Sequence, residues 1–535
     1  MGTGSKVEKN PWKTKAVERS GENKSLRKEL VRQKARAGSW REDAFVFRNK
    51  CSTQAKEIAS MSLIIKDLES SVVSPCRQNV EEEAPLGRYK YKLSLIWLSV
   101  NLHKIGLSYR GVCEVLGLLR TFMGLKFPIP SYGTVRIWSQ KVGLHLLKNG
   151  GKIAISGKKK VETWCLIADE SYSLGKSQLL VILAVRLSSL KQGQALRCED
   201  VVPIEIRSQP TWKGEEVATV LKSAIKKIDG KVIYGVADKG ASLVNGFQIV
   251  GLPHIPDWSH FSSNILEKCY VDNDDFKAFN EKMGAFKKKR KQSQYTDYSP
   301  PNLSVKVRFM NYDLFLEWAN TMLANFKKIP VEIAPELQFL NELKPFIGEM
   351  TDLFKMRQKI GFLLKTEGIN SITQSKVMDL LKILEKDMNT KYPNPLKVMA
   401  FILGTKQYFA LTMPLYEQIH KQNNAQKGTQ NTEKGNVAPL FDGLVASSDI
   451  IESIFGKLKH RAPKDPKRGF TAFTLIITLF CTDLSISDTA KALKCISVDE
   501  LEKWEKKNLN IRPYKSFRNV FKTKSKKGKG SKPVV

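Results

Sequence analysis

The spacing of hydrophobic positions changes along the chain and divides it into regions. Over residues 1–76, apolar side chains recur every three to four positions among many charged ones, which is typical of amphipathic helices. We interpret this stretch as a basic helical arm, with pairing into a coiled coil as the alternative. Residues 88–150 show the same period in shorter segments separated by turns that contain Gly and Pro. This second region is expected to form a compact group of helices.

Between residues 160 and 262 the pattern changes to short apolar runs bounded by turn residues, which predicts β-strands. Three consecutive strands come first, and helices then alternate with two further strands. That order favours a mixed sheet with helices packed on it. The predicted strands are 162–168, 177–187, 201–207, 231–237 and 254–258, and the predicted helices are 214–228 and 240–249.

The helical period returns after residue 262 and continues to the C-terminal region. Residues 263–440 are expected to form an all-helical domain, and residues 441–490 add helices that return to the sheet domain. Residues 491–535 are interpreted as a basic tail, because Arg512–Lys532 contains nine Lys or Arg and no acid. The pattern as a whole predicts an α+β protein of several domains.

The composition indicates a polyanionic partner. The 535 residues include 88 Lys or Arg and 53 Asp or Glu, which gives a net charge of +35, and such an excess attracts nucleic acid. A membrane partner is not expected, because the longest apolar run, Phe473–Cys481, is well short of the ~20 residues that span a bilayer. The eight cysteines are scattered, which excludes zinc-finger spacing and is typical of a reducing compartment. We expect a cytoplasmic protein associated with the nucleoid, or a nuclear one in a eukaryotic host.

Residues 88–150 are the first candidate for DNA contact. Ser108 and Ser131 each precede a helical segment and are suited to cap it. Short helices joined by tight turns, the last of them amphipathic, are typical of a helix-turn-helix unit. An ordinary helical bundle has the same pattern and is the alternative. In the DNA-binding interpretation, the last helix presents Arg136, Gln140 and Lys141 to DNA.

Two of the predicted strands end at a carboxylate. Asp169 follows the first strand, and Asp238 follows the fourth. If these strands pair in parallel, the two side chains come close together, and they repel one another unless a cation lies between them. Mg²⁺ prefers such oxygen ligands, so the pair is a candidate metal site. The alternative is that both residues cap the segments that follow. Glu170 should point to the opposite face of the sheet.

The order of strands and helices, with Asp169 in the first strand and Asp238 after the fourth, resembles the ribonuclease H-like fold. DDE-type DNA transposases of that fold carry a third acidic residue on a later helix, and some have an all-helical domain inserted before it. The resemblance assigns this third position to Glu452, with Asp449 one turn earlier as the alternative. It implies a ribonuclease H-like core in two parts, 160–262 and 441–490, interrupted by an all-α insertion and preceded by the helical DNA-binding region.

Two shorter motifs extend the resemblance, which covers about residues 160–490. Asp257 and His260 are similar to the C/D-x-x-H motif that follows the second Asp in hAT-like and RAG-like recombinases. Lys459 follows Glu452 at the spacing of the Glu-x6-Lys signature of bacterial insertion-sequence transposases, in which the Lys contacts the DNA backbone. The Tyr and Arg that precede the Glu in that signature are replaced by Val445 and Ser448, so the chain departs from the pattern there.

The resemblance implies a Mg²⁺-dependent DNA transposase, in which Mn²⁺ would substitute, that cleaves transposon ends and transfers the strands by a two-metal mechanism. Asp169, Asp238 and Glu452 would be the catalytic residues and the metal ligands. The implied partners are double-stranded DNA, as terminal inverted repeats and as target, and further copies of the chain in a homodimer or larger assembly. His260 would orient the scissile phosphate, or else support its loop. Trp318 would stack on a flipped base, or else lie in a core.

Two other functions are compatible with the sequence. One is a DNA-binding regulator that keeps the fold without catalysis, against which the intact set of carboxylates argues. The other is a ribonuclease H-like nuclease that does not join ends. The basic terminal segments and the long helical region favour transposition over this second alternative.

Overall fold

A computed structural model describes residues 90–152, 162–302, 309–427, 442–462 and 469–510. The chain divides into two compact units. The described part of the smaller unit is 271–302 and 309–348, and the larger unit contains the described residues from 90 to 270 and from 349 to 510. The predicted helical arm and the basic segment Arg512–Lys532 lie outside the described residues.

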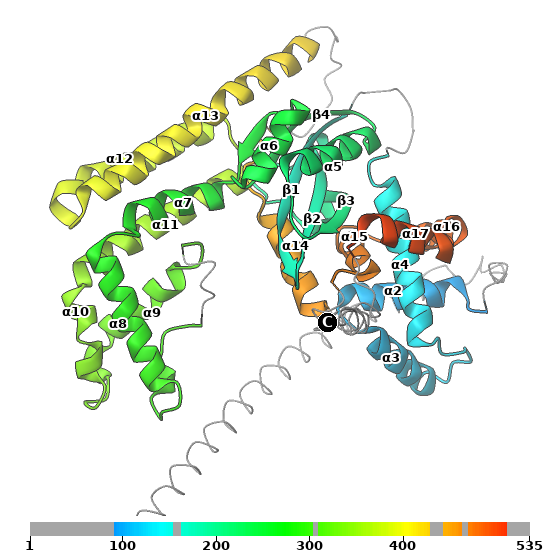
Figure 1. Cartoon of the computed structure of the whole chain (residues 1–535), viewed down its shortest axis with the longest axis horizontal. Coiled ribbons are helices and arrows are strands. Elements are labelled where there is room, and N and C mark those ends of the chain that lie inside the picture. The colour runs from blue at the N-terminus through cyan, green and yellow to red at the C-terminus, as the bar shows by residue number, and fades with distance from the viewer. Residues whose placement is uncertain (1–89, 153–161, 303–308, 428–441, 463–468, 511–535) are drawn as a thin grey trace, which may run out of the picture. The chain divides into compact units, whose positions relative to one another are not determined.

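The larger unit contains a five-stranded mixed sheet in the order β3-β2-β1-β4-β5 (Figure 1). β1 pairs antiparallel with β2, and β2 pairs antiparallel with β3. β4 pairs parallel with both β1 and β5. The predicted mixed sheet is thus confirmed, and the first and fourth strands pair in parallel, which is the condition under which Asp169 and Asp238 are expected to come together. The strands are β1 Thr163–Leu174, β2 Ser177–Arg186, β3 Val201–Gln209, β4 Lys231–Ala237 and β5 His254–Pro256.

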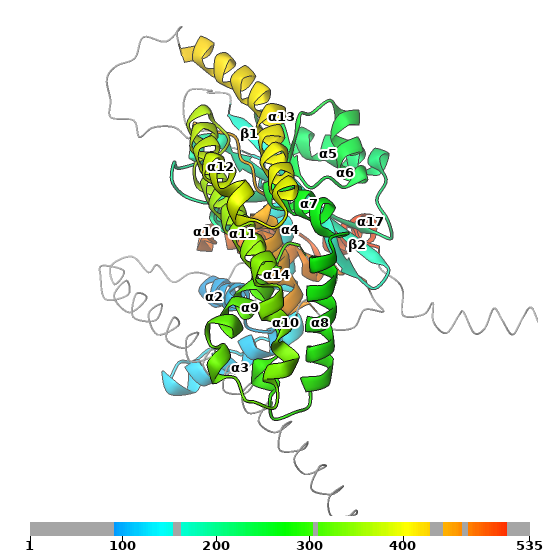
Figure 2. The ribbon, with the colours of Figure 1, turned by 90° about the vertical axis from the view of Figure 1, so that its left-hand side faces the viewer.

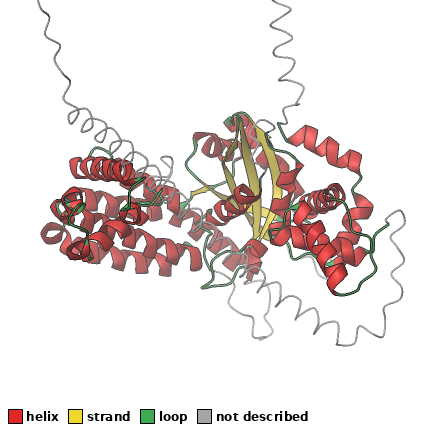
Figure 3. Cartoon of the chain, turned by 90° about the horizontal axis from the view of Figure 1, so that it is seen from below, coloured by secondary structure: helices red, strands yellow, loops and turns green. Residues whose placement is uncertain are grey.

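Helices cover both faces of the sheet (Figure 3). On one face, α5 (Gly214–Lys227) and α6 (Ala241–Val250) pack on alternate strand residues, and Leu166 of β1 is completely buried there. On the other face, α14 (Asp449–Arg461) packs against β1 and α15 (Ile476–Phe480) packs against β3. Because both faces are covered, β2 and the first half of β1 are almost continuously apolar.

A glycine permits a close approach between helix and strand next to the site. Gly235 lies in β4, and a Cβ atom at this position would overlap the ring of Phe247 in α6. Phe247 is completely buried and stacks on His254 of β5, with 5.3 Å between the ring centroids. This packing fixes the strand whose end carries Asp238.

Helices α2, α3 and α4 form the group predicted for residues 88–150. This group is not a separate domain, because it packs against the C-terminal helices of the larger unit. α4 packs against α15, α16 and α17. The indole of Trp97 in α2 donates a 2.6 Å hydrogen bond to the carbonyl of Leu484. At the end of α14, the guanidinium of Arg461 donates to the carbonyl oxygens of His103 and Lys104 in α2. The bounds are α2 Leu93–Ile105, α3 Tyr109–Phe122, α4 Tyr132–Asn149, α16 Ile486–Cys495 and α17 Val498–Asn508.

Helix α17 lies inside the range that the sequence assigns to a basic tail. Ser497 caps this helix by accepting a hydrogen bond from the backbone N–H of Glu500, and Leu501 is buried. Glu500 also forms an ion pair with Lys148 of α4. The folded unit therefore includes α17, and the predicted boundary at residue 491 lies inside it.

The remaining helices of the larger unit follow β5. α7 (Trp258–Tyr270) packs against α13 (Pro395–Lys427), and α13 also packs along α12 (Ser371–Lys391), beside which it lies in Figures 1 and 2. The hydroxyl of Tyr408 in α13 donates to the carbonyl of Pro256 at the end of β5. Helix α11 (Lys344–Thr366) belongs to this unit from Glu349 onward. The 3-10 helices of this unit are Leu187–Ser189, Cys198–Asp200 and Ala472–Leu475.

The smaller unit is helical and has an aromatic core of its own. Phe276 and Phe279 of α8 and Tyr312 before α9 are buried together. No strand occurs among the described residues from 263 to 427, which agrees with the all-helical prediction, although contacts divide these residues between the two units. No described helix is long and apolar enough to cross a membrane. The helices are α8 Asp274–Arg290, α9 Asp313–Ala324 and α10 Phe339–Glu342, with 3-10 helices at Thr296–Tyr298, Phe326–Lys328 and Ala334–Leu337.

Candidate active site

Asp169 and Asp238 stand at the ends of two neighbouring parallel strands. In the register between β1 and β4, Ala168 lies opposite Ala237, and each is followed by one of the two aspartates. Asp169 is 4% exposed and still pairs with Val181 of β2, after which the β1–β2 register shifts. The buried strands thus place both carboxylates at one edge of the parallel part of the sheet.

Glu170 lies on the opposite face from Asp169, as alternation along the strand predicts. Its carboxylate accepts a hydrogen bond from Ser242 in the first turn of α6. Burial raises the pKa of Glu170, Ser242 opposes this rise, and the charges of Asp238 and Asp169 add to it. Burial is the main cause of the raised pKa of Glu170, and the two aspartate charges add to it.

His260 is held at the start of α7 by the buried carboxylate of Asp257. Asp257 Oδ2 accepts hydrogen bonds from the backbone N–H of His260, at 2.9 Å, and from its Nδ1, at 3.0 Å. Burial lowers the pKa of His260, but Asp257, with Glu452 and Asp238 nearby, outweighs burial and raises this pKa to about 9. Burial would raise the pKa of Asp257, yet the His260 side chain and the backbone N–H groups hold it below its usual range. His260 is therefore an imidazolium at neutral pH.

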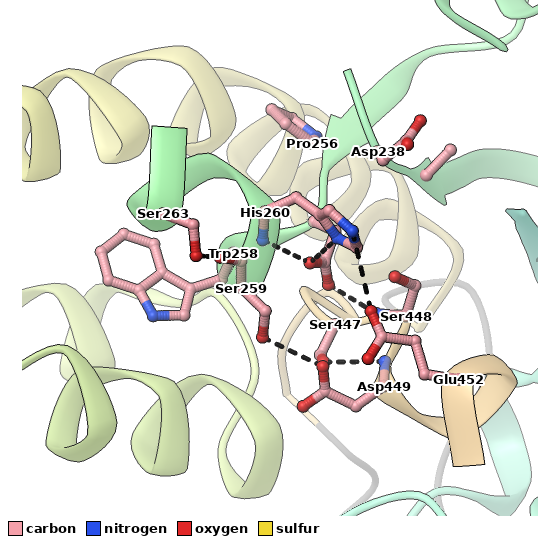
Figure 4. A network of polar contacts seen from close by, with 12 residues as sticks. Asp238, Pro256, Trp258, Ser259, His260, Ser263, Ser447, Ser448, Asp449 and Glu452 are labelled. Atoms are coloured by element: carbon pink, nitrogen blue, oxygen red, sulfur yellow. Dashed lines mark hydrogen bonds and ion pairs between the residues drawn. The ribbon is translucent and has the colours of Figure 1, made fainter. Parts of the chain in front are cut away.

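Glu452 lies in the first turn of α14 and faces His260 (Figure 4). Its Oε1 atom is 3.7 Å from Nε2 of His260. Burial raises the pKa of Glu452; His260 opposes this, and Asp449, Asp257 and Asp169 reinforce it, so that the pKa reaches about 7. The structure thus brings Glu452 and His260 into the same charged neighbourhood as Asp169 and Asp238.

Asp449 has a different environment from Glu452, although the two are one turn apart. Its carboxylate forms an ion pair with Lys365 of α11 and accepts a 3.0 Å hydrogen bond from the hydroxyl of Ser259 (Figure 4). These contacts bind the start of α14 to α7 and α11. Asp449 thus makes contacts that anchor the helix, whereas the contact of Glu452 is with His260.

Lys459 lies two turns beyond Glu452 on α14. Its side chain is exposed, and its Nζ atom is 5.2 Å from the centre of the Tyr172 ring. Gly456 stands between them in the sequence, and a Cβ atom added there would meet nothing within 4 Å. The side of the helix that runs from Glu452 toward Lys459 is open at this position.

The predicted DNA-contacting residues of α4 differ in exposure. Arg136 is exposed and Gln140 is half-buried, but Lys141 is only 8% exposed, contrary to the prediction that it meets DNA. The reason is that α4 is covered from its middle onward by other helices of the unit. Sequence reasoning missed Arg110, whose guanidinium lies 5.2 Å from the centre of the exposed Tyr132 ring. The sequence did contain a signal for Arg110 as a candidate DNA contact, because it is a basic residue in the first turn of a helix that Ser108 caps.

Trp318 occupies a core position in the smaller unit. It is 9% exposed, and its indole donates a 2.9 Å hydrogen bond to the carbonyl of Tyr298. In this position its ring is not available to stack on a base. The structure thus favours the core alternative over base stacking.

The carboxylates at this site have the donor chemistry that Mg²⁺ prefers. Asp169 and Asp238 are neighbours by register, and the raised pKa values of Glu170 and Glu452 both include a contribution from Asp169. Among the described residues, however, no group of three or more His, Cys, Asp or Glu side chains is gathered closely enough to hold a metal ion. The donor set therefore suits the cation chemically, while the arrangement shown pairs Glu452 with His260.

Comparisons with known proteins add little to this geometry. No protein-family model matches the sequence, and a search of characterised proteins finds no similar sequence. Among solved structures, the chain is similar to the Drosophila P element transposase strand transfer complex, with 12% identity over 79% of this chain and 99% of that chain. The TM-score is 0.39. A TM-score this low does not establish a shared fold, so we base the function on the residues described above.

Proposed function

We propose that the protein is a DNA transposase of the DDE type, which cleaves the ends of a transposon and joins them to target DNA with Mg²⁺ as cofactor. The observation that carries this proposal is the parallel pairing of β1 and β4, which sets Asp169 and Asp238 at adjacent strand ends. The contact between Glu452 and His260 beside them supplies the third carboxylate and a cation for the substrate phosphate.

The sheet supports a ribonuclease H-like core for this enzyme. Three antiparallel strands are followed by two parallel ones, and the first strand lies in the centre of the sheet. Helix α14 returns to β1 after a long helical stretch of chain. That stretch corresponds to the all-α insertion of the family, and α14 corresponds to the helix that carries the third acidic residue.

In the proposed site, Asp169, Asp238 and Glu452 hold the metal ions. Bound Mg²⁺ would lower the pKa of the attacking hydroxyl and neutralise charge on the leaving oxygen. Asp257 keeps His260 protonated, so that Nε2 presents a positive N–H to the scissile phosphate beside Glu452. Because Asp449 is anchored to Lys365 and Ser259, we assign the third catalytic carboxylate to Glu452.

Double-stranded DNA is the proposed partner. The net charge of +35 favours a polyanion, and Arg110 and Arg136 lie exposed near the start of α4, where the helix N-terminus also favours phosphate. Both the terminal repeats of the transposon and the target DNA would bind, in a homodimer or a larger assembly that holds two ends together. Such an enzyme would act at the nucleoid or in a nucleus.

The proposal is tested by nicking of a duplex that carries the end of the element, with Mg²⁺, with Mn²⁺ and with EDTA. We expect both cations to support nicking by the wild type, and D169N and D238N to abolish it while DNA binding persists. The matched control is D379N, because Asp379 is exposed on α12. Binding without cleavage by the wild type would favour a DNA-binding regulator, and cleavage without joining would favour a simple nuclease.

A further inference from the structure

Two lysines, one in the loop after β4 and one in α7, follow residues of the proposed site in the sequence. Lys239 directly follows Asp238, and its Nζ atom is 4.1 Å from the centre of the Phe261 ring, one residue after His260. Lys268 lies two turns further along α7. Phe261 and Lys268 are seven residues apart and so lie on the same side of α7, which places the two lysines along one side of this helix. The side chain of Lys239 is thus directed along α7.

No acidic partner accounts for this pair of like charges. Both lysines are exposed, and among the described residues neither has a carboxylate within ion-pair distance. Lys397 of α13 is different, because it donates a hydrogen bond to the carbonyl of Cys269 at the end of α7 and so has a structural role. Two neighbouring ammonium groups without a carboxylate match a phosphate, whose oxygens accept from both.

We propose that Lys239 and Lys268 form a phosphate-binding pair that holds the sugar–phosphate backbone of the DNA strand next to Asp238. This inference rests on the proposed function for the identity of the ligand. The DNA strand would run from the proposed catalytic carboxylates along α7, past the ring of Phe261. Lys239 and Lys268 act as positioning residues, because they hold the strand and do not take part in the bond that is cut.

The test measures binding of random-sequence duplex DNA in EDTA at several salt concentrations, for K239Q, K268Q and the double variant. Each phosphate contact that is lost should lower the slope of log K against log salt by ~0.9. The matched control is K222Q, because Lys222 is exposed on α5, on the far face of the sheet, and its slope should not change. K239R should keep the slope of the wild type, since it retains the charge.

A structural role for the lysines predicts a different result. If Lys239 served only to cover Phe261, K239Q would lower the melting temperature and leave the salt slope unchanged, and that outcome would overturn the inference. If the wild type binds and nicks DNA while both single variants keep its slope, the phosphate pair is wrong and the proposed function stands. If the variants lose slope but the wild type never nicks DNA with Mg²⁺, the pair stands and the proposed function is wrong.

Discussion

The backbone N–H of Ser448 donates a 2.7 Å hydrogen bond to the buried carboxylate of Asp257, across 191 positions of sequence. Asp257 follows β5, and Ser448 precedes α14. The same carboxylate also binds the backbone and the ring of His260. One side chain therefore fixes both partners of the contact between His260 and Glu452, and the long helical stretch between them does not have to do so.

Substitution of Asp257 by Ala should destabilise the larger unit strongly. It leaves the buried N–H of Ser448 and the half-buried imidazolium of His260 without their acceptor, and removal of one partner of such a group costs ~3–5 kcal/mol. Urea unfolding in EDTA measures the loss. D379A, at an exposed aspartate of α12, should change stability by less than about 0.5 kcal/mol. Equal stability of the two variants would show that Asp257 is not an anchor.

Conservative substitutions should distinguish the roles of Glu452 and Asp449. E452Q removes the carboxylate proposed for catalysis, so we expect nicking to fall below detection with little change in melting temperature. D449N weakens the ion pair with Lys365, so it should lower stability by ~1 kcal/mol and reduce nicking only in part. The reverse result, an active E452Q and an inactive D449N, would transfer the catalytic role to Asp449.

The stability of the larger unit should depend on pH through Glu205 of β3. Burial would raise the pKa of Glu205, but Lys227 and Arg207 outweigh it and hold this pKa below the usual value of 4.5. A carboxyl whose pKa is lowered by folding contributes stability above its unfolded pKa and loses it as the pH falls. E205Q should therefore be less stable than the wild type at pH 7, by ~1–3 kcal/mol, and the difference should shrink below pH 4.5. A difference that stays constant with pH would contradict the charge pairing.

Arg136 should contribute to recognition of the element's ends. R136A is expected to weaken specific binding by ~1–3 kcal/mol if the side chain contacts a base, as footprinting of the end sequence would measure. Deletion of residues 88–150 is not a clean test, because α4 packs against α15, α16 and α17. The control is K494A, at an exposed lysine of α16 in the same group. Equal footprints for R136A and K494A would show that Arg136 does not contact the end sequence.

The central part of the fold could be predicted from the apolar runs. β4 has the predicted bounds, because Lys231–Ala237 is a buried strand between clear turn residues. β1 extends to Leu174, beyond the predicted end at residue 168. The extra residues are mostly polar, and they become a strand only because they pair with β2 after the register shift at Asp169. Pairing of this kind depends on the neighbouring strand, so the spacing of hydrophobic residues within β1 does not predict it.

The candidate site was predictable only in part. Asp169 and Asp238 could be found because strand ends are visible in the sequence, whereas Glu452 was found through resemblance. The role of Asp257 as an anchor was not predictable, since its partner Ser448 is distant in sequence. Lys141 was assigned to the wrong face because the helices that cover α4 come from the C-terminal region, which the local pattern of α4 does not reveal.

Glu452 lies in the first turn of helix α14 and Arg461 is its last residue, whose guanidinium donates hydrogen bonds to the last turn of α2. A short α-helix is stiff, and Glu452 and Arg461 are about 14 Å apart along its axis at 1.5 Å per residue. A displacement of α2 therefore either breaks the hydrogen bonds of Arg461 or is transmitted along the helix to the carboxylate. If the N-terminal helices bind DNA as proposed, a shift of α2 on binding would change the position of Glu452 through α14, so the free energies of DNA binding and of Glu452 alignment would be coupled.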